Sequence, residues 1–177
     1  MFIFLFGFVF LIQAFNIPLP YGASIHLLGA ALVSILIGSP WAAVLLISIV
    51  LIFQGLFFGN GGLLTLGANI FNMGIIGGFV GFYIYKTSKK LGKIPSTLVG
   101  GFSAGWGSMF VVGGVFAIEL GLSGLFPIDK AISTIGLYSA IAGIIEGFMT
   151  MVGCVVILIL RSIIKKERKV TQKGQVS

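Results

Sequence analysis

Residues 132–160 have the sequence ISTIGLYSAIAGIIEGFMTMVGCVVILIL, an apolar run of 29 residues with a single charged side chain, Glu146, near its middle. A helix needs about 20 predominantly apolar residues to cross the hydrocarbon core of a bilayer. No proline interrupts this run. It therefore predicts a membrane-spanning helix and indicates the fold class of the whole chain.

The composition of the chain supports a lipid-embedded fold. Of its 177 residues, 58% are hydrophobic and only 8% are charged, whereas an ordinary soluble domain carries about 25% charged residues because its surface must meet water. So few charges cannot cover a compact body in water, which excludes a soluble globular domain.

Five further apolar runs end at glycine, proline or charged residues. The predicted fold is an all-α integral membrane protein, a compact bundle of about six transmembrane helices. A loop broken by Pro18 and Pro20 follows the first helix on the outer side. The bundle is predicted over residues 1–160, and a basic cytoplasmic tail over residues 161–177. The predicted membrane segments are residues 1–15, 23–38, 41–58, 63–85, 96–122 and 132–160.

The basic residues of the chain lie in two clusters. Eleven Lys and Arg residues against four acidic ones give a net charge of +7, and most of them fall within residues 86–93 or in the tail. Because cytoplasmic loops carry an excess of Lys and Arg, both clusters are expected in the cytoplasm. Six segments then predict a multi-pass protein of the cell membrane with both termini cytoplasmic, and residues 18–25, 59–62 and Asp129 outside. We interpret this charge as an orientation signal, with the bilayer and no nucleic acid as partner.

The 27 glycines of the chain indicate tight helix packing. Small residues recur on one helical face in residues 74–81 and again in residues 100–108. In lipid, where the hydrophobic effect does not drive helix association, small residues allow close backbone approach. A tight bundle with little room for a wide pore is predicted.

Two common motifs of hydrolytic chemistry are absent from the sequence. It contains no Gly-x-x-x-x-Gly-Lys-Ser/Thr phosphate loop and no His-Glu-x-x-His. The single cysteine, Cys154, forms neither a disulfide framework nor a cysteine metal site. We therefore expect no enzyme, and a transport component would need its ATPase on another chain.

His26, the only histidine, is the candidate metal ligand. It follows the proline-broken loop, where non-helical backbone is tolerated when it lines a cavity or is buried in protein. Neutral imidazole suits nickel, cobalt, copper or zinc. The alternative is an ordinary interfacial histidine that is hydrogen-bonded to a carbonyl.

Polar and acidic side chains within the apolar segments form the second group of candidates. Asn69 and Asn72 are three residues apart and share a helix face, and together with Ser24 we assign them the role of bracing the loops around the ligand. Interhelical hydrogen bonding is the alternative for the two amides. Glu119 and Glu146 are interpreted as structural, since no chain of titratable partners for a proton relay is visible and a carboxylate at this depth must be protonated or hydrogen-bonded.

Four stretches together resemble one protein family. They are PYGASIHLLG at residues 20–29, GSPWAA at 38–43, GGLLTLGANIFNMG at 61–74 and GIIEGFMT at 143–150. This pattern is similar to the CbiM/NikM family, the membrane substrate-capture subunit of cobalt and nickel energy-coupling-factor transporters.

The resemblance implies that the chain captures Co²⁺ or Ni²⁺ as cargo and carries no resident cofactor. It implies work with a transmembrane coupling subunit, cytoplasmic ATPase subunits and a small auxiliary membrane subunit. It further implies a planar four-nitrogen metal site built from the amino terminus, a histidine directly after the first Met, and the histidine of a Gly-x-Ser-x-His loop. His26 matches this last ligand.

The sequence departs from the family pattern at its start and at two further positions. It begins Met1-Phe2 in place of Met-His, it has Ser139 near the place of another family histidine, and it has Asn60 where an aspartate is usual. Either the sequence is truncated before Met1, which the short first segment favours, or it is a divergent member that does not bind metal tightly.

Two other function classes stay open at this point. A capture subunit for another small nutrient, such as a vitamin, predicts an aromatic-lined outer cavity beneath residues 20–26. A small membrane enzyme predicts a cavity that holds Glu119, Glu146 and His26 within hydrogen-bond reach.

Overall fold

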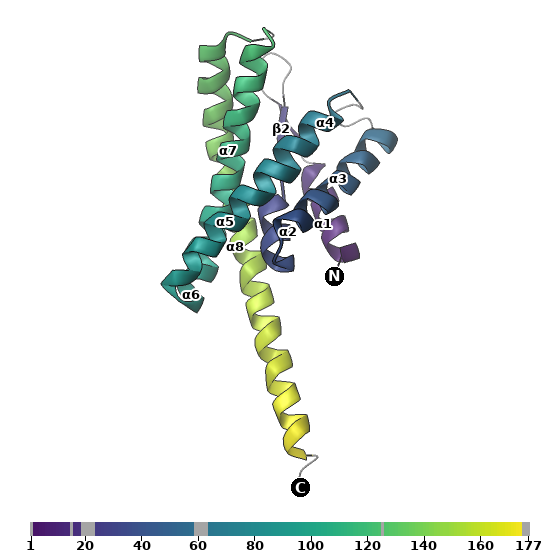
Figure 1. Ribbon diagram of the computed structural model, residues 1–177, viewed down its shortest axis with the longest axis vertical. Helices are drawn as coiled ribbons and strands as arrows, with labels where there is room; N and C mark the ends of the chain where they lie inside the picture. Colours follow the sequence, from purple (N-terminus) through teal and green to yellow (C-terminus); the bar gives the residue numbers. More distant parts are fainter. Residues whose placement is uncertain (1, 15, 19–23, 59–63, 125, 175–177) are drawn as a thin grey trace.

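The computed structural model describes residues 2–14, 16–18, 24–58, 64–124 and 126–174, and these form a helical bundle with one short two-stranded sheet (Figure 1). The predicted all-α membrane bundle is confirmed. Among the described residues, four helical stretches are long and apolar enough to cross a membrane: Pro40–Phe57, Leu66–Leu91, Lys93–Leu122 and Ile128–Ile163. In chain order the elements are α1 (Phe2–Gln13), β1 (Asn16–Pro18), β2 (Ser24–His26), α2 (Ala30–Ile37), α3 (Pro40–Phe57), α4 (Leu66–Asn69), the π-helical η2 (Ile70–Gly77), α5 (Gly78–Ser88), the 3-10 turn η3 (Lys89–Leu91), α6 (Lys93–Pro95), the π-helical η4 (Ser96–Gly100), α7 (Gly101–Leu122) and α8 (Ile128–Gly174).

The first two segments are shorter helices than the sequence predicted. α1 has 12 residues, and the expected helix over residues 23–38 is instead strand β2 followed by α2, which has eight residues. The physical reason lies at Gly29, which precedes α2 with a left-handed φ of 70°. A residue in this conformation cannot continue a helix. Pro18 ends β1, whereas Pro20, Gly22 and the turn at 59–62 lie outside the described residues.

The predicted spans agree with the structure for the remaining helices, with bounds that shift by a few residues except at the C-terminal end of α8. α3 occupies Pro40–Phe57 and begins with Pro40 in its first turn, where the missing N–H costs nothing. α8 begins at Ile128 and continues without a break through Leu160 to Gly174.

α8 presents two different faces to its surroundings. Its inner face repeats at intervals of three or four residues, as the helical period requires. Its outer face carries large exposed apolar side chains, as expected where lipid is the solvent. The buried residues include Ile135, Ser139, Ala142, Glu146, Thr150 and Cys154; the exposed ones include Ile141, Ile144, Ile145, Phe148 and Val152.

Glycine makes the closest helix contacts, as the sequence predicted. A Cβ atom at Gly105 of α7 would lie 2.5 Å from the Glu146 carbonyl oxygen and 2.6 Å from Thr150 Oγ1, both on α8. A Cβ at Gly81 of α5 would collide with the backbone and side chain of Ala31 in α2. α7 and α8 therefore pack with their backbones close together, and Figure 1 shows them side by side.

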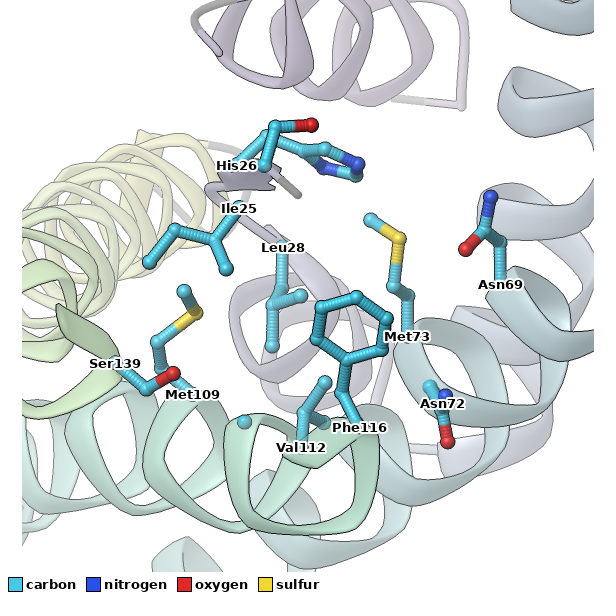
Figure 2. Close-up of a pocket in the computed structure, with 12 residues that line it drawn as sticks. Ile25, His26, Leu28, Asn69, Asn72, Met73, Met109, Val112, Phe116 and Ser139 are labelled. Atoms are coloured by element: carbon cyan, nitrogen blue, oxygen red, sulfur yellow. The ribbon is translucent and has the colours of Figure 1, made fainter. Parts of the chain in front are cut away.

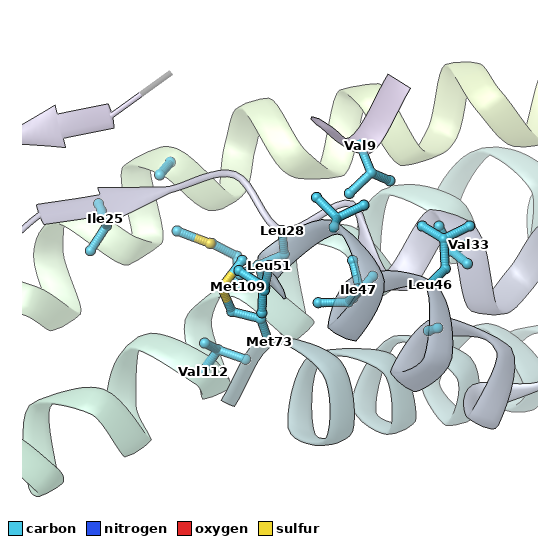
Figure 3. Close-up of a cluster of buried hydrophobic side chains, with 14 of the residues drawn as sticks. Val9, Ile25, Leu28, Val33, Leu46, Ile47, Leu51, Met73, Met109 and Val112 are labelled. Atoms are coloured by element: carbon cyan, nitrogen blue, oxygen red, sulfur yellow. The ribbon is translucent and has the colours of Figure 1, made fainter. Parts of the chain in front are cut away.

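The apolar core lies where α1, α2, α3, η2 and α7 meet. Val9, Leu28, Ile47, Met73 and Val112 converge in this cluster (Figure 3). An aromatic group ties α1 to α3: Phe53 lies edge-on to Phe6 and Phe10, with ring centroids 6.0 and 5.9 Å away. The core thus closes one end of a polar space between α1, β2, η2 and α7.

The two ends of the bundle differ in character. The basic segment that contains α6 lies at the same end as the C-terminal part of α8, and α1 also begins toward that end (Figure 1). β2, the start of α4 and the end of α7 lie toward the opposite end. The elements that carry the candidate residues therefore gather away from the basic segment.

Candidate functional site

The pairing of β1 with β2 positions His26. The two strands are antiparallel, with Asn16 opposite His26 and Pro18 opposite Ser24. Because β1 follows α1 directly, this register brings His26 close to the C-terminal end of α1, where Gln13 lies buried. The side chains of His26 and Gln13 line the same cavity.

Two adjoining cavities meet at His26. The larger has a volume of about 390 Å³ and lies between α1, β2, α3, α4, η2 and α7. The smaller, of about 60 Å³, reaches toward Met73, Met109 and Ser139. Figure 2 shows the imidazole of His26 and the amide of Asn69 projecting into the same space beside Met73. Polar lining of the larger cavity is provided by Gln13, Ser24, His26, Gln54, Thr65, Asn69, Asn72, Glu119 and Ser123.

The imidazole of His26 is in the chemical state that a metal ligand needs. Its Nδ1 is buried and has no hydrogen-bond partner among the described residues. His26 lies in β2, outside the four long helices. Burial lowers the pKa of His26 from its usual value, and a hydrogen bond to the Leu27 backbone raises the pKa by a smaller amount. The side chain is therefore neutral at pH 7, and neutral imidazole is the form that binds transition metals.

Two buried amides present oxygen atoms that lack donors. Gln13 Nε2 donates to the Leu28 carbonyl at 2.9 Å, and Asn72 Nδ2 donates to Glu119 Oε2 at 2.6 Å. A carbonyl or ionised carboxylate only accepts hydrogen bonds, so each amide must turn its nitrogen toward it. Gln13 Oε1 and Asn72 Oδ1 are consequently left buried without a partner in the described part of the chain.

Glu119 is a site residue that the sequence interpretation missed. It was expected to be structural, yet it lines the larger cavity together with His26. Gln13 and Gln54 were also missed, although a signal was present. Both are amides within apolar segments, where an amide must find partners, and that same argument identified Asn69 and Asn72.

The structure places the other predicted site residues around His26. Ser24 and Asn69 line both cavities, and Asn69 Nδ2 donates to Thr65 Oγ1 at 3.4 Å. Asn72 lies in η2, and π-helical segments occur frequently at functional sites. Ser139 is fully buried and lines the smaller cavity with His26. Asn60 lies outside the described residues.

Glu146 has the structural hydrogen bonds that the sequence predicted. Its two carboxylate oxygens accept the backbone N–H groups of Leu28 at 2.9 Å and Gly29 at 2.8 Å. Glu146 is not among the residues that line the two cavities around His26. It therefore holds the segment that links His26 to α2, and the cavity that an enzyme would need, with both carboxylates beside His26, is not formed by the described residues.

The larger cavity beside His26 presents nitrogen and oxygen donors, and the smaller cavity adds the thioethers of Met73 and Met109. Within the described residues, no group of three or more His, Cys, Asp or Glu side chains lies close enough to hold a metal ion. Phe116 contributes the one phenyl ring among the described side chains that line the larger cavity. The lining is polar, which does not favour the aromatic-lined pocket expected for a vitamin.

The fold and this site define a class of protein: a multi-pass membrane protein with a polar cavity buried beside a broken helical segment. The family model described as the cobalt uptake substrate-specific transmembrane region, CbiM, matches residues 1–163. The chain belongs to this family.

Related proteins carry transport names. The cobalt transport protein CbiM of Sorangium cellulosum is 34% identical over 151 residues, covering 80% of this chain and 65% of that protein. The fused nickel transport protein NikMN of Rhodobacter capsulatus is 34% identical over 128 residues, which is 71% of this chain and 36% of that protein.

Solved structures are similar over most of the chain. The crystal structure of a truncated transition metal transporter has a TM-score of 0.80 and 34% identity, covering 91% of this chain and 79% of that one.

A relative from Methanocaldococcus jannaschii, 41% identical over 114 residues, is covered over 51% of its length. The chain thus spans about half the length of several curated relatives that it matches.

Proposed function

We propose that this chain captures Co²⁺ or Ni²⁺ from outside the cell for an energy-coupling-factor transporter. The observation that carries the proposal is the imidazole of His26, whose buried Nδ1 has no partner among the described residues, at the wall of a cavity in a chain of the cobalt uptake family. An imidazole nitrogen favours these two ions over magnesium or calcium, which prefer oxygen ligands alone.

In this proposal His26 is the metal ligand, and Ser24, Asn69 and Asn72 support the loops around it. The three supporting residues line the cavities together with His26, which agrees with that role. Amide oxygens are hard ligands, so the two asparagines are better suited to orienting the site than to binding nickel.

We further propose the orientation and the partners of the chain. Residues 1–160 form the bundle within the membrane, and the basic tail at 161–177 and the basic segment at 86–93 lie in the cytoplasm with both termini. There the positive charge would face the transmembrane coupling subunit, the ATPase subunits that supply energy, and a small auxiliary membrane subunit. The position of α6 at the end of the bundle from which α8 extends supports this arrangement (Figure 1).

The test is equilibrium binding of Ni²⁺ to the purified chain in detergent micelles, compared with His26→Ala. We expect the substitution to weaken binding at least about 10-fold. Removal of a ligand should cost at least about 1.4 kcal/mol of binding free energy, which corresponds to a tenfold change in Kd. Ser48→Ala in α3 is the control, since its hydroxyl bonds only within its own helix, to the Val44 carbonyl at 2.7 Å.

The outcome of this comparison decides the role of His26. Equal Ni²⁺ affinities for the wild-type chain and His26→Ala would remove His26 from the metal site. An equal loss in Ser48→Ala would show that the loss reflects disturbed packing of the bundle and not a missing ligand.

A further inference from the structure

Three buried atoms on residues that line the larger cavity beside His26 have no hydrogen-bond partner in the described part of the chain. They are Gln13 Oε1, Asn72 Oδ1 and His26 Nδ1. The carboxylate of Glu119 lies on the same wall, held by the Asn72 amide. An unpaired buried acceptor costs about 1–3 kcal/mol, and a cation relieves several such acceptors at once.

These acceptors come from four separate elements. Gln13 ends α1, His26 ends β2, Asn72 lies in η2 and Glu119 lies in the last turn of α7. The Leu28 carbonyl holds the amide nitrogen of Gln13, and the Glu119 carboxylate holds that of Asn72. Neither amide can turn its nitrogen in another direction without losing this hydrogen bond. The two amide oxygens therefore stay without a donor among the described residues.

We propose that Glu119, Asn72 and Gln13 form an oxygen-lined site that takes up a hydrated divalent cation before His26 binds it. Carboxylate and amide oxygens suit hydrated divalent cations, whose water ligands donate hydrogen bonds. The further transfer of the ion to the imidazole rests on the proposed function, whereas the oxygen-lined site itself does not.

The size of the cavity agrees with a hydrated ion. A water molecule occupies roughly 30 Å³ in the liquid, so a shell of about six waters needs about 180 Å³. The larger cavity has about 390 Å³, whereas the smaller one beside Ser139 has about 60 Å³. An ion can thus enter the larger cavity with its water shell, which the smaller cavity cannot hold.

The carboxylate of Glu119 supplies the charge that attracts the cation. A cleft of one charge sign with low-dielectric walls raises the local concentration and the association rate of an oppositely charged ligand by about 10- to 1,000-fold. Glu119 lies in the last turn of α7, at the end of the bundle opposite the basic segment (Figure 1). Its expected effect is therefore mainly on association of the ion.

Mn²⁺ is the probe for the oxygen-lined site, because it prefers oxygen ligands and its free form is measured by electron paramagnetic resonance. We expect the purified chain to bind Mn²⁺ and Glu119→Gln to weaken that binding at least about 10-fold. This variant keeps an amide oxygen that can accept from Asn72, so the packing is preserved. Glu119→Asp, which keeps the charge, should retain more of the Mn²⁺ binding than Glu119→Gln.

Asp129→Asn is the matched control, because Asp129 is an exposed carboxylate in the first turn of α8. It should change Mn²⁺ affinity less than about 2-fold. His26→Ala should weaken Ni²⁺ binding more than Mn²⁺ binding. In stopped-flow mixing with Ni²⁺, Glu119→Gln should slow association about 10-fold and leave dissociation nearly unchanged.

The two proposals can fail separately in these measurements. Mn²⁺ binding that depends on Glu119, with Ni²⁺ affinity insensitive to His26→Ala, would overturn the proposed role of His26 and keep the oxygen-lined site. No Mn²⁺ binding above that of empty micelles, or equal losses in Glu119→Gln and Asp129→Asn, would overturn the oxygen-lined site, because the cavity would then hold water alone or the charge effect would be nonspecific.

Discussion

Replacement of Glu146 tests how the His26 segment is held. The carboxylate accepts two backbone N–H groups, from Leu28 and Gly29, and is 1% exposed. A buried donor left without a partner costs about 1–3 kcal/mol. Glu146→Ala leaves both donors unpaired, so we expect it to lower the free energy of unfolding by about 2–6 kcal/mol. Glu146→Gln keeps one acceptor oxygen and should cost about half as much.

Denaturant titration in detergent micelles, followed by the fluorescence of Trp41 and Trp106, measures these free energies. Asp129→Asn on the same helix is the control; its carboxylate is exposed near the helix N-terminus, where it contributes about 1 kcal/mol or less. The expected order of stability is wild type, then Gln, then Ala at position 146, with Asp129→Asn close to wild type.

Metal binding provides a second measure of the same hydrogen bonds. Leu28 lies two residues after His26, so release of its N–H should loosen the imidazole and weaken Ni²⁺ binding in both variants at position 146. The reasoning is refuted if Glu146→Ala and Glu146→Gln both unfold within about 0.5 kcal/mol of the wild type. A large loss of stability with unchanged Ni²⁺ affinity would refute only the link to His26.

Two further substitutions address packing and orientation. Gly105→Ala should destabilise the bundle by about 1–3 kcal/mol through overpacking against the Glu146 carbonyl. Gly114→Ala on the same helix, where an added Cβ meets nothing within 4 Å, should be neutral or slightly stabilising in the same titration. Equal effects of the two substitutions would contradict the close α7–α8 contact. For orientation, Lys90→Cys should react with a membrane-impermeant maleimide only after the cells are opened, whereas Asp129→Cys should react in intact cells. The native Cys154 is buried and should stay unlabelled in both variants. The reverse labelling pattern would invert the proposed topology.

The long helices could be predicted from the sequence because hydrophobic length is a local property. The run at residues 132–160 is apolar enough to span a membrane whatever its neighbours do, and α8 includes all of it. The close approach at Gly105 was also visible as small residues recurring on one face. The exact ends of the helices could not be predicted, since residues such as Pro95 can lie in the first turns of a helix.

The segment around His26 could not be predicted in the same way. Residues 23–38 are as apolar as a short span, and nothing local indicates that a helix begins only at Ala30. The contact that fixes this segment joins Gly29 to Glu146, which is 117 residues away in the chain. A buried carboxylate that accepts two backbone N–H groups satisfies these donors and so allows non-helical backbone inside the bundle.

The candidate site was found in part because its signals differ in kind. A lone histidine after a broken segment stands out in any apolar sequence, and so do two asparagines three residues apart. Glu119 and Gln13 are single polar residues in separate segments, and their meeting depends on how α1 and α7 pack. The argument applied to Asn69 and Asn72, that an amide in an apolar helix must find partners, would have identified Gln13 and Gln54 as well.

Two carboxylates of the bundle illustrate how the fold gives one residue type two roles. Glu146 is buried, accepts backbone N–H groups with both of its oxygens and lies outside the two cavities, so it holds the chain before α2. Glu119 is half-buried and accepts from the side chain of Asn72, and it lines the larger cavity with Asn72 and Gln13, whose amide oxygens have no partner among the described residues. A carboxylate with both oxygens bonded to the backbone is satisfied by the protein, whereas we propose that Glu119 binds a cation. The same reasoning predicts that replacing Glu119 affects ions more than folding, and that replacing Glu146 affects folding first.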